Sequence, residues 1–398
     1  MRNKASFAVV LLATGVCAQA ARTQDQFTPL VASTLTANVR PFFGTDEKTH
    51  LVYELVLTNA SATPATLQKI GVVDSSNLSV TLASFSGADL LSRLRTPGAA
   101  PVTTLTIEAS ETRLLLIDFA LDPSAKAPLR LMHGIQLLGA SMPSRTPQTP
   151  LALSYALAPI DINTQLPTIG PPLAGDRWVA VNGCCDEAGA HRPSGLGCNG
   201  GLYFAQRFAI DWMKLDKQGR LAEGDGSDVH QYPDYGADIL AVADGAIVDT
   251  LNSLNDQKPG TLPDRSTINM QNVDGNHIVI NLGDGVYAFY AHLQKGSVLV
   301  SVGDRVKRGQ VLAKLGNTGN TSGPHLHFHL MDGPSVLCSN GIPYTIDSFA
   351  MAGQISLSDF AKATGVEGDW SKGMFPAPGS RQGQYPMDLN IVDFPSAQ

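Results

Sequence analysis

The 398-residue sequence is low in aromatic and charged side chains, which make up 7% and 16% of its residues. No stretch after the first twenty residues reaches about 18 uninterrupted apolar positions, so a conventional transmembrane helix is excluded there. Basic runs are also missing, and the formal net charge is −7. We therefore expect neither nucleic acid nor anionic lipid as a partner, because both require clustered positive charge.

The first twenty residues have the pattern of an export signal. Arg2 and Lys4 precede an apolar stretch at residues 5–16, and small residues at 18–20 suit cleavage. We expect the mature chain to be exported, to the periplasm or the outside of the cell. A lipid anchor at Cys17 is the alternative, although the residue before it is large. Loss of the leader would leave 26 basic against 35 acidic residues.

Four of the five cysteines lie beyond this leader, at Cys184, Cys185, Cys198 and Cys338. An even number in an exported chain favours disulfides, and four cysteines allow three pairings. Because adjacent cysteines seldom pair with each other, we expect one of the first two to bind Cys198 and the other to bind Cys338. The alternative is a zinc site built from all four cysteines.

Turn-rich and proline-rich segments divide the rest of the chain into an all-β, two-domain protein. Residues 22–160 hold short alternating runs separated by turn clusters, which is typical of an immunoglobulin-like antiparallel sandwich. We interpret this domain as a binding or spacer module. A proline-punctuated linker is expected at 161–177, a second β domain at 178–345, and a carboxy-terminal extension at 346–398. The Pro-, Gly- and Ser-rich part of that extension, from residue 371, is expected to be surface coil.

The most informative stretch runs from Gly323 to Leu330, because it holds three of the nine histidines. On a β-strand, alternate residues share a face and lie about 6.6 Å apart. His325, His327 and His329 would then share one face, with apolar residues on the other. This pattern favours a metal site over an ordinary half-buried strand, since one imidazole could hold a metal while its neighbour reaches the metal's water.

Two further residues could join these histidines. Asp211 lies between Ile210 and Trp212, where a buried carboxylate needs a cation or hydrogen bonds. His292 ends another apolar run. A catalytic zinc usually takes three N or O ligands and leaves a position for water, whose pKa falls to about 7. With a base beside that water, the residue types present suffice for a hydrolytic site.

Several motifs surround these residues: Gly275-Asn276-His277-Ile278-Val279-Ile280, Tyr290-Ala291-His292-Leu293, Val302-Gly303-Asp304-Arg305-Val306, and Gly316-Asn317-Thr318-Gly319 continuing to Phe328. Together they resemble the M23 family, the LytM-type zinc endopeptidases that cut peptide cross-links of bacterial cell walls. The resemblance covers roughly residues 205–332. It implies a LytM-type antiparallel β-sheet metallopeptidase domain with Zn2+ as its cofactor.

The resemblance also implies a role for each matched residue. Asp211 and His327 match metal ligands of the family. His292 and His325 match the two histidines that flank the metal-bound water, and they are the expected catalytic residues.

One family ligand has no counterpart in this chain. The family has a histidine four residues before the aspartate, and this sequence has Arg207 there. A guanidinium offers no lone pair to zinc. We expect His191 to supply the missing ligand, with His230 and His329 as alternatives; His329 could instead support a ligand from outside the metal's coordination sphere.

The resemblance therefore implies an exported zinc-dependent endopeptidase that hydrolyses peptide cross-links of bacterial peptidoglycan, or another peptide substrate. Its groove is expected to be walled by residues 252–274 and 316–323. Arg207 keeps open a second interpretation, a degenerate, non-catalytic relative that binds or regulates cell-wall hydrolases. Wall binding by residues 22–160 is compatible with either function.

Overall fold

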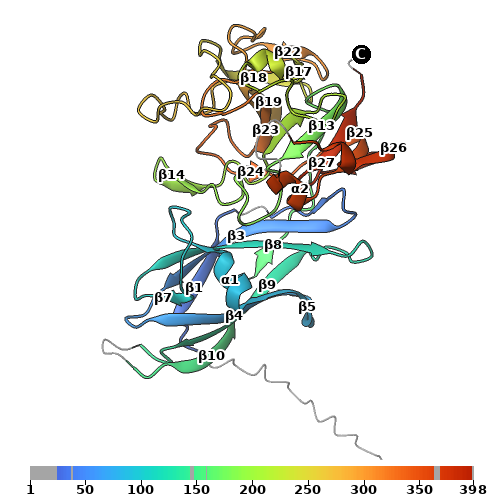
Figure 1. Ribbon diagram of the computed structural model, residues 1–398. Helices are drawn as coiled ribbons and strands as arrows, with labels where there is room; N and C mark the ends of the chain where they lie inside the picture. Colours follow the sequence, from blue (N-terminus) through green and yellow to red (C-terminus); the bar gives the residue numbers. More distant parts are fainter. Residues whose placement is uncertain (1–24, 37–38, 144–147, 158, 363–367, 397–398) are drawn as a thin grey trace, which may run out of the picture.

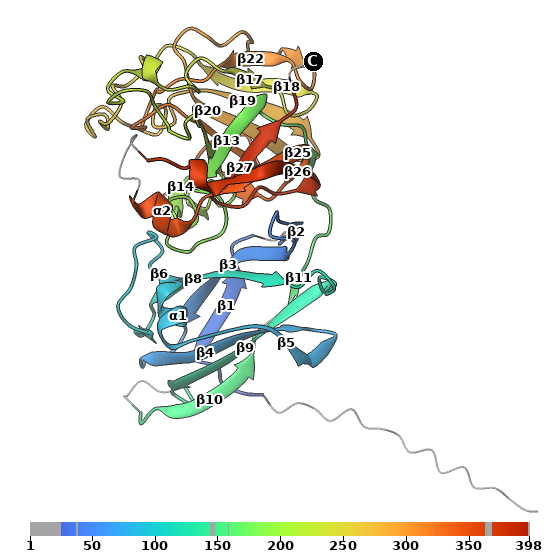
Figure 2. The same ribbon diagram turned by 45° about the vertical axis from the view of Figure 1, so that its right-hand side comes forward.

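The computed structural model describes residues 25–36, 39–143, 148–157, 159–362 and 368–396, so the expected signal peptide lies outside the described residues. The expected all-β fold is confirmed, and the strands form two stacked regions (Figures 1 and 2). We call residues 30–161 the sandwich region and residues 168–394 the large-sheet region. No helix within the described ranges is long and apolar enough to cross a bilayer.

The sandwich region consists of two antiparallel sheets. The first has the order β1 (Leu30–Thr34), β3 (Thr49–Asn59), β8 (Thr112–Leu121) and β6 (Leu94–Arg95), with β2 (Phe42–Phe43) paired to β3. The second has the order β10 (Leu151–Ala156), β9 (Arg130–Gly139), β4 (Ala65–Asp74) and β5 (Asn77–Ser86), with β11 (Ile160–Asp161) on β9 and β7 (Thr106–Ile107) on β4. Helix α1 (Gly87–Ser92) follows β5. One core cluster draws side chains from both sheets, so they pack face to face. An immunoglobulin-like topology stays a prediction.

Strand β3 is buried on both of its faces, which alternate along the strand. Tyr53 points into the core between the two sheets, whereas Val52 joins the core of the large-sheet region. Strand β8 behaves in the same way, since Leu116 packs against Phe204 of the large-sheet region. The outer face of this first sheet is therefore the interface between the two regions.

A twelve-stranded sheet organises the large-sheet region. Its order is β12 (Thr168–Ile169), β25 (Thr345–Gln354), β27 (Asn390–Phe394), β13 (Gly175–Val181), β16 (Ile210–Lys214), β23 (Leu326–Met331), β20 (Val286–Leu293), β19 (Asn276–Gly283), β18 (Gly245–Leu251) and β21 (Arg305–Val306), with β24 (Gly341–Ile342) on β23 and β26 (Met374–Gln384) on β25. Two small sheets pair β14 (Leu196–Cys198) with β15 (Gly201–Tyr203) and β17 (Asp238–Leu240) with β22 (Val311–Lys314). The short helices are η1 (Val229–Gln231), α2 (Leu357–Lys362) and η2 (Ser371–Gly373).

The expectation of surface coil from residue 371 onward is wrong. Strand β26 pairs with β25, and β27 lies between β25 and β13 within the large sheet. Strand β26 contains Pro376 and Pro378, which an edge strand tolerates because its outward N–H groups have no ladder partner. The Pro-, Gly- and Ser-rich composition of this segment therefore gave no sign of its two strands, which form by pairing with a distant part of the chain.

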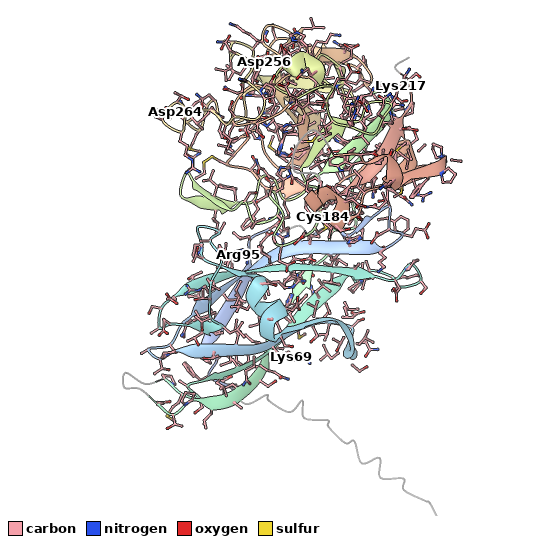
Figure 3. The ribbon with its side chains drawn as sticks, viewed as in Figure 1. Lys69, Arg95, Cys184, Lys217, Asp256 and Asp264 are labelled. Atoms are coloured by element: carbon pink, nitrogen blue, oxygen red, sulfur yellow. A yellow bond between two sulfur atoms is a disulfide. The ribbon has the colours of Figure 1, made fainter. Side chains whose placement is uncertain are left out.

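The expected disulfide pairing is also wrong. Cys184 lies at bonding distance from Cys185, and Cys198 lies at bonding distance from Cys338. The neighbouring backbone explains the second pair, since Gly341 N donates to Phe204 O at 2.9 Å and draws the β14–β15 hairpin toward the loop after β23. Cys184 instead lies buried in a core cluster that includes Val52 of the sandwich region, where the two regions meet (Figure 3).

Candidate metal centre

The centre of the site is a pair of residues that face each other on adjacent strands. Asp211 on β16 is the direct antiparallel partner of His327 on β23. Directly opposed side chains have Cβ atoms about 4.5–5.5 Å apart, close enough for their polar ends to meet. His327 Nδ1 lies 2.9 Å from Asp211 Oδ1. The register of two strands therefore brings together residues that are 116 positions apart in sequence.

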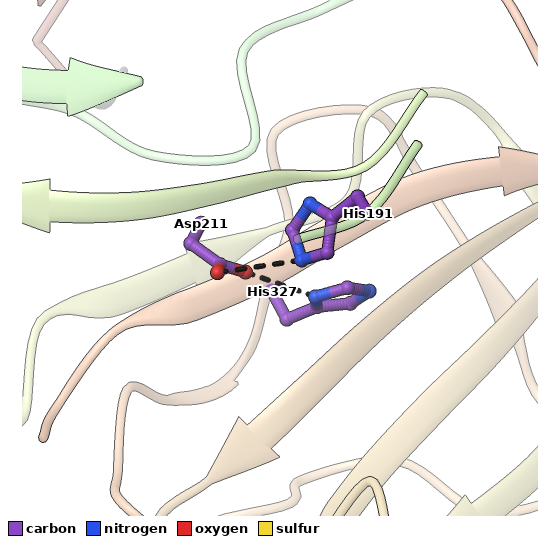
Figure 4. A group of neighbouring side chains, drawn as sticks. All are labelled: His191, Asp211 and His327. Carbon is purple, nitrogen blue, oxygen red and sulfur yellow. Dashed lines mark hydrogen bonds and ion pairs between the residues drawn. The ribbon is translucent and has the colours of Figure 1, made fainter. Parts of the chain in front are cut away.

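His191 reaches the same carboxylate from the loop that follows β13 (Figure 4). Its Nδ1 lies 2.9 Å from Asn182 O and 3.1 Å from Ala209 O. Carbonyl oxygens only accept hydrogen bonds, so Nδ1 carries the ring hydrogen and Nε2 keeps its lone pair. That Nε2 faces Asp211 Oδ2 at 3.4 Å. The loop thus presents a metal-binding nitrogen to the Asp211 carboxylate.

The residues present fit a zinc ion. Within the described part of the chain, the ligand atoms of His191, Asp211 and His327 lie within 4.8 Å of one another, and all three residues are buried. Two donors around a tetrahedral zinc ion are roughly 3.3–3.6 Å apart, which the 3.4 Å separation of His191 and Asp211 matches. Two histidines and one carboxylate are a donor set typical of catalytic zinc, with a fourth position left for water.

Neither alternative ligand belongs to this group of three. His230 is on η1, with a side chain 77% exposed and paired with Asp228. His329 is buried next to His327, and its Nδ1 lies 3.0 Å from His327 Nε2. The ionised carboxylate only accepts hydrogen bonds, so His327 Nδ1 donates to it; a zinc ion on Nδ1 would leave the ring hydrogen on Nε2, which would then donate to His329 Nδ1. His329 therefore orients the ring of His327 from behind.

His292 and His325 lie side by side at the mouth of this cluster, with ring centroids 4.6 Å apart. His292 Nδ1 donates to Thr318 O at 2.8 Å, and His325 Nδ1 donates to Gly323 O at 2.9 Å. Each ring therefore keeps a lone pair on Nε2. His325 Nε2 is 3.5 Å from Asp211 Oδ1, so both expected catalytic residues border the cluster.

One glycine, Gly275, allows the close packing that holds His292. A Cβ on Gly275 would lie 2.2 Å from Thr318 O, the oxygen that receives the His292 hydrogen bond. Only glycine allows this approach, and its φ of 70° also lies in the left-handed region. His292 itself has φ 61°, a backbone conformation uncommon for non-glycine residues and frequent at functional sites.

Burial and mutual charge set the protonation of this cluster. Burial raises the pKa of Asp211, but His191 and His325 outweigh it, and the pKa is held well below its usual value. Burial lowers the pKa of His191, yet Asp211 outweighs that effect and raises it. Burial and neighbouring His325 keep the pKa of His292 well below normal. The carboxylate is therefore ionised and His292 is neutral near pH 7.

A cavity of about 610 Å³ opens over the cluster. As expected, both predicted loops wall it, one through Leu262 and Asp274 and the other through residues 320–323. Phe360 and Trp370 of the carboxy-terminal segment also line it. The site is thus a pocket with polar and apolar side chains in its walls and a histidine-rich floor, large enough to hold a stretch of peptide.

The sequence interpretation missed two polar residues of this pocket. Asn182 Nδ2 donates to Asp211 Oδ2 at 2.7 Å, and its signal was an Asn-Gly pair directly after an apolar run. Asp234 is buried in the pocket wall, with one oxygen lacking a partner among the described residues. Burial raises the pKa of Asp234 to about 8. Nothing in the polar 217–235 segment marked this aspartate as buried.

Comparison with known families gives one match. Residues 225–337 match Peptidase family M23. The matched range includes His292, His325 and His327, and it begins after Asp211.

Curated relatives agree with this match over short segments. The peptidoglycan DD-endopeptidase ShyA of Vibrio cholerae is 46% identical over 57 residues, which are 14% of this chain and 13% of the relative. The glycyl-glycine endopeptidase ALE-1 of Staphylococcus capitis is 48% identical over 58 residues, 14% of this chain and 16% of the relative. The chain thus aligns with less than a fifth of the length of either relative. A solved zinc-containing peptidase from Vibrio cholerae is 14% identical over 72% of this chain and 80% of its own, with a TM-score of 0.25.

Proposed function

From the M23 peptidase domain at residues 225–337, we propose that this protein is an exported, zinc-dependent endopeptidase that hydrolyses peptide cross-links of bacterial peptidoglycan. The observation that carries the proposal is the buried group of His191, Asp211 and His327 at the floor of a peptide-sized cavity. ShyA and ALE-1, which are named as cell-wall peptide endopeptidases, support the substrate class. The expected division of the chain into two domains, joined by a linker at residues 161–177, belongs to the same proposal.

We assign zinc binding to His191 Nε2, His327 Nδ1 and the carboxylate of Asp211. A zinc ion held there supplies Lewis-acid polarisation of a peptide carbonyl and lowers the pKa of water. Asn182 holds the Asp211 carboxylate in place, and His329 holds the ring of His327. The His329 contact fixes which nitrogen of His327 faces the ion, and the hydrogen bonds from His191 Nδ1 to Asn182 O and Ala209 O do the same for His191.

His292 and His325 do the proton work in this proposal. Both donate from Nδ1 to backbone carbonyls, so Nε2 of each ring is free to accept a proton from the attacking water. Once protonated, a ring can donate to the oxyanion or to the leaving amine. The paired rings, 4.6 Å apart, allow one to act as base while the other stabilises developing negative charge.

The test is digestion of purified peptidoglycan by the mature chain, followed by mass spectrometry of the released peptides. We expect wild type to release new amino and carboxyl termini, and His325→Ala to lose about 10²–10⁴-fold in rate. Zinc content should remain the same in His325→Ala, because this residue is not assigned as a ligand.

The non-catalytic alternative predicts a different result. It rests on Arg207, which stands where the family has a ligand, and His191 now offers a nitrogen at the same carboxylate. A zinc-loaded wild type that cleaves neither peptidoglycan nor isolated cross-link peptides would contradict the endopeptidase proposal and favour a wall-hydrolase regulator.

A further inference from the structure

Glu54 is a fully buried carboxylate at the interface between the two regions. It lies in the middle of β3, is 0% exposed, and points toward the large-sheet region. Two arginines of that region bind it, Arg192 through Nη1 and Arg207 through both Nε and Nη2. The Arg207 Nε to Glu54 Oε1 distance is 2.8 Å. One carboxylate of the sandwich region therefore joins two cations of the other region.

Further donors of both arginines go to backbone oxygens, whereas Arg192 Nε has no partner among the described residues. Arg192 Nη2 donates to Tyr53 O at 2.9 Å and to Ile117 O at 3.3 Å, both in the sandwich region. Arg207 Nη1 donates to Gly341 O at 2.9 Å on β24. Both arginines are buried, so without Glu54 they would be left as unpaired charges in a dry interface.

These arginines occupy two segments that hold His191. Arg192 is the next residue after His191, so a guanidinium fixed on β3 fixes the backbone that carries the imidazole. Arg207 lies two residues before Ala209, whose carbonyl accepts the His191 Nδ1 hydrogen bond at 3.1 Å. That hydrogen bond directs Nε2 toward Asp211. The position of His191 thus depends on two arginine side chains that both bind Glu54.

We propose that Glu54 is a positioning residue for the metal centre, acting through Arg192 and Arg207 to hold His191 as a zinc ligand. The metal centre is then complete only when the sandwich region is docked, although that region contributes no ligand. This inference rests on the proposed zinc site, and it assigns the sandwich region a role in building that site.

The test is a zinc titration of the full chain against a chelating dye. Glu54→Gln keeps the shape of the side chain but removes its charge, and Glu54→Asp keeps the charge but shortens the reach. Glu111→Gln is the matched control, because Glu111 pairs with Arg113 in the same region at 2.6 Å. Thermal unfolding of each metal-free variant shows whether it is folded.

We expect Glu54→Gln to bind zinc about 10–100-fold more weakly than wild type, the range seen for residues that support a ligand. Glu54→Asp should fall between the two, and Glu111→Gln should equal wild type. Cobalt loading adds a spectroscopic check. The visible absorption of Glu54→Gln should shift toward that of His191→Ala, while that of Glu111→Gln should overlay wild type.

A folded Glu54→Gln with wild-type zinc affinity and an unshifted cobalt spectrum overturns the inference, even if its metal-free melting temperature is lower. If Glu54→Gln does not fold, Glu54→Asp decides by the same two measurements against Glu111→Gln. A wild-type chain that binds no zinc contradicts the proposed function itself, and the inference falls with it.

Discussion

Two buried carboxylates in this molecule have cationic partners of different kinds. Glu54, at the interface, is held by two guanidinium groups, and Asp211, on the large sheet, is held by imidazoles. Burial raises the pKa of each, and in each the neighbouring side chains outweigh it and lower the pKa. Electrostatically the two clusters are alike, yet only one can hold a metal.

The difference lies in whether the partner side chains can lose a proton. A guanidinium stays protonated and offers only hydrogen-bond donors, so the arginines of the Glu54 cluster have no lone pair for a metal ion. We call it the closed cluster. An imidazole can lose its proton and present a lone pair, so the Asp211 cluster can exchange protons for a metal ion. We call it the open cluster. Arg207 and Asp211 are only four residues apart, and they belong to different clusters. Partner chemistry, more than burial or distance, therefore separates a structural cluster from a candidate metal centre.

The largest expected effect comes from breaking the closed cluster. Glu54→Gln should lower the free energy of unfolding of the metal-free chain by about 3–5 kcal/mol, because two buried arginines lose their counter-charge. Urea unfolding followed by fluorescence measures this. Replacing all three members together, as Glu54→Leu with Arg192→Met and Arg207→Met, should cost less than the single change. A triple variant less stable than Glu54→Gln would contradict this account.

Next in size is the loss of a ligand from the open cluster. His327→Ala should weaken zinc binding by more than about 100-fold, beyond the range for residues that only support a ligand. His191→Ala should do the same. His230→Ala is the matched control, since this exposed histidine should leave zinc stoichiometry unchanged. Inductively coupled plasma mass spectrometry of dialysed protein gives the answer, and one tightly held zinc in His327→Ala would refute the ligand assignment.

A third buried carboxyl, that of Asp234, differs from both because it forms no salt bridge within the described part of the chain. Lys214 N donates to Asp234 Oδ2 at 3.4 Å, and the pKa of about 8 for this carboxyl lies above the unfolded value of about 3.9. Its contribution to stability is therefore fully present below pH 4 and is lost as the pH rises to 8. Relative to wild type, Asp234→Asn should gain stability over this range, by at most about 1.4 kcal/mol per pH unit.

Urea unfolding at pH 5 and pH 8.5 measures the Asp234 effect. Asp284→Asn serves as control, because Asp284 is exposed in a hairpin turn and its substitution should have the same effect at both pH values. An Asp234→Asn variant whose stability difference from wild type does not change with pH would refute the raised pKa.

The smallest effect is expected where a carboxylate has an arginine partner but also contact with water. Glu111 is 37% exposed and pairs with Arg113. Glu111→Gln should cost less than about 1 kcal/mol in free energy of unfolding, as is usual for surface pairs. Compared with Glu54→Gln in the same denaturation series, it separates the effect of pairing from the effect of burial. Equal losses in the two variants would show that burial is not the cause.

Much of the site could be predicted because it follows local rules. Alternation predicted that the histidine strand has one apolar face, and Phe328 and Leu330 indeed lie in the main core. The family motifs predicted the all-β peptidase region, and the turn residues predicted the loops that wall the pocket. His191 was expected at the site from the loop before the Asp211 strand, with His230 and His329 as alternatives, and its Nε2 lies 3.4 Å from Asp211 Oδ2.

Other features depended on distant parts of the chain and left no local signal. Glu54 sits in an otherwise apolar strand, and alternation alone suggests a solvent-facing residue. Its burial requires knowing that a second region covers that face. Cys198 pairs with Cys338 because of where the β14–β15 hairpin packs, and the spacing of the cysteines does not specify that position. Strand β26 was concealed by its prolines.

The place of β27 in the large sheet has a consequence for the synthesis of the protein. Val392 on β27 pairs with Trp178 on β13, the strand next to the one that holds Asp211. At roughly 5–20 residues per second, a ribosome needs on the order of 10 to 40 s to make the chain between these partners. Until then β13 has an open edge, and the growing chain cannot complete the sheet beneath the histidines. The sheet that carries Asp211 is therefore completed only after nearly the whole chain has been made.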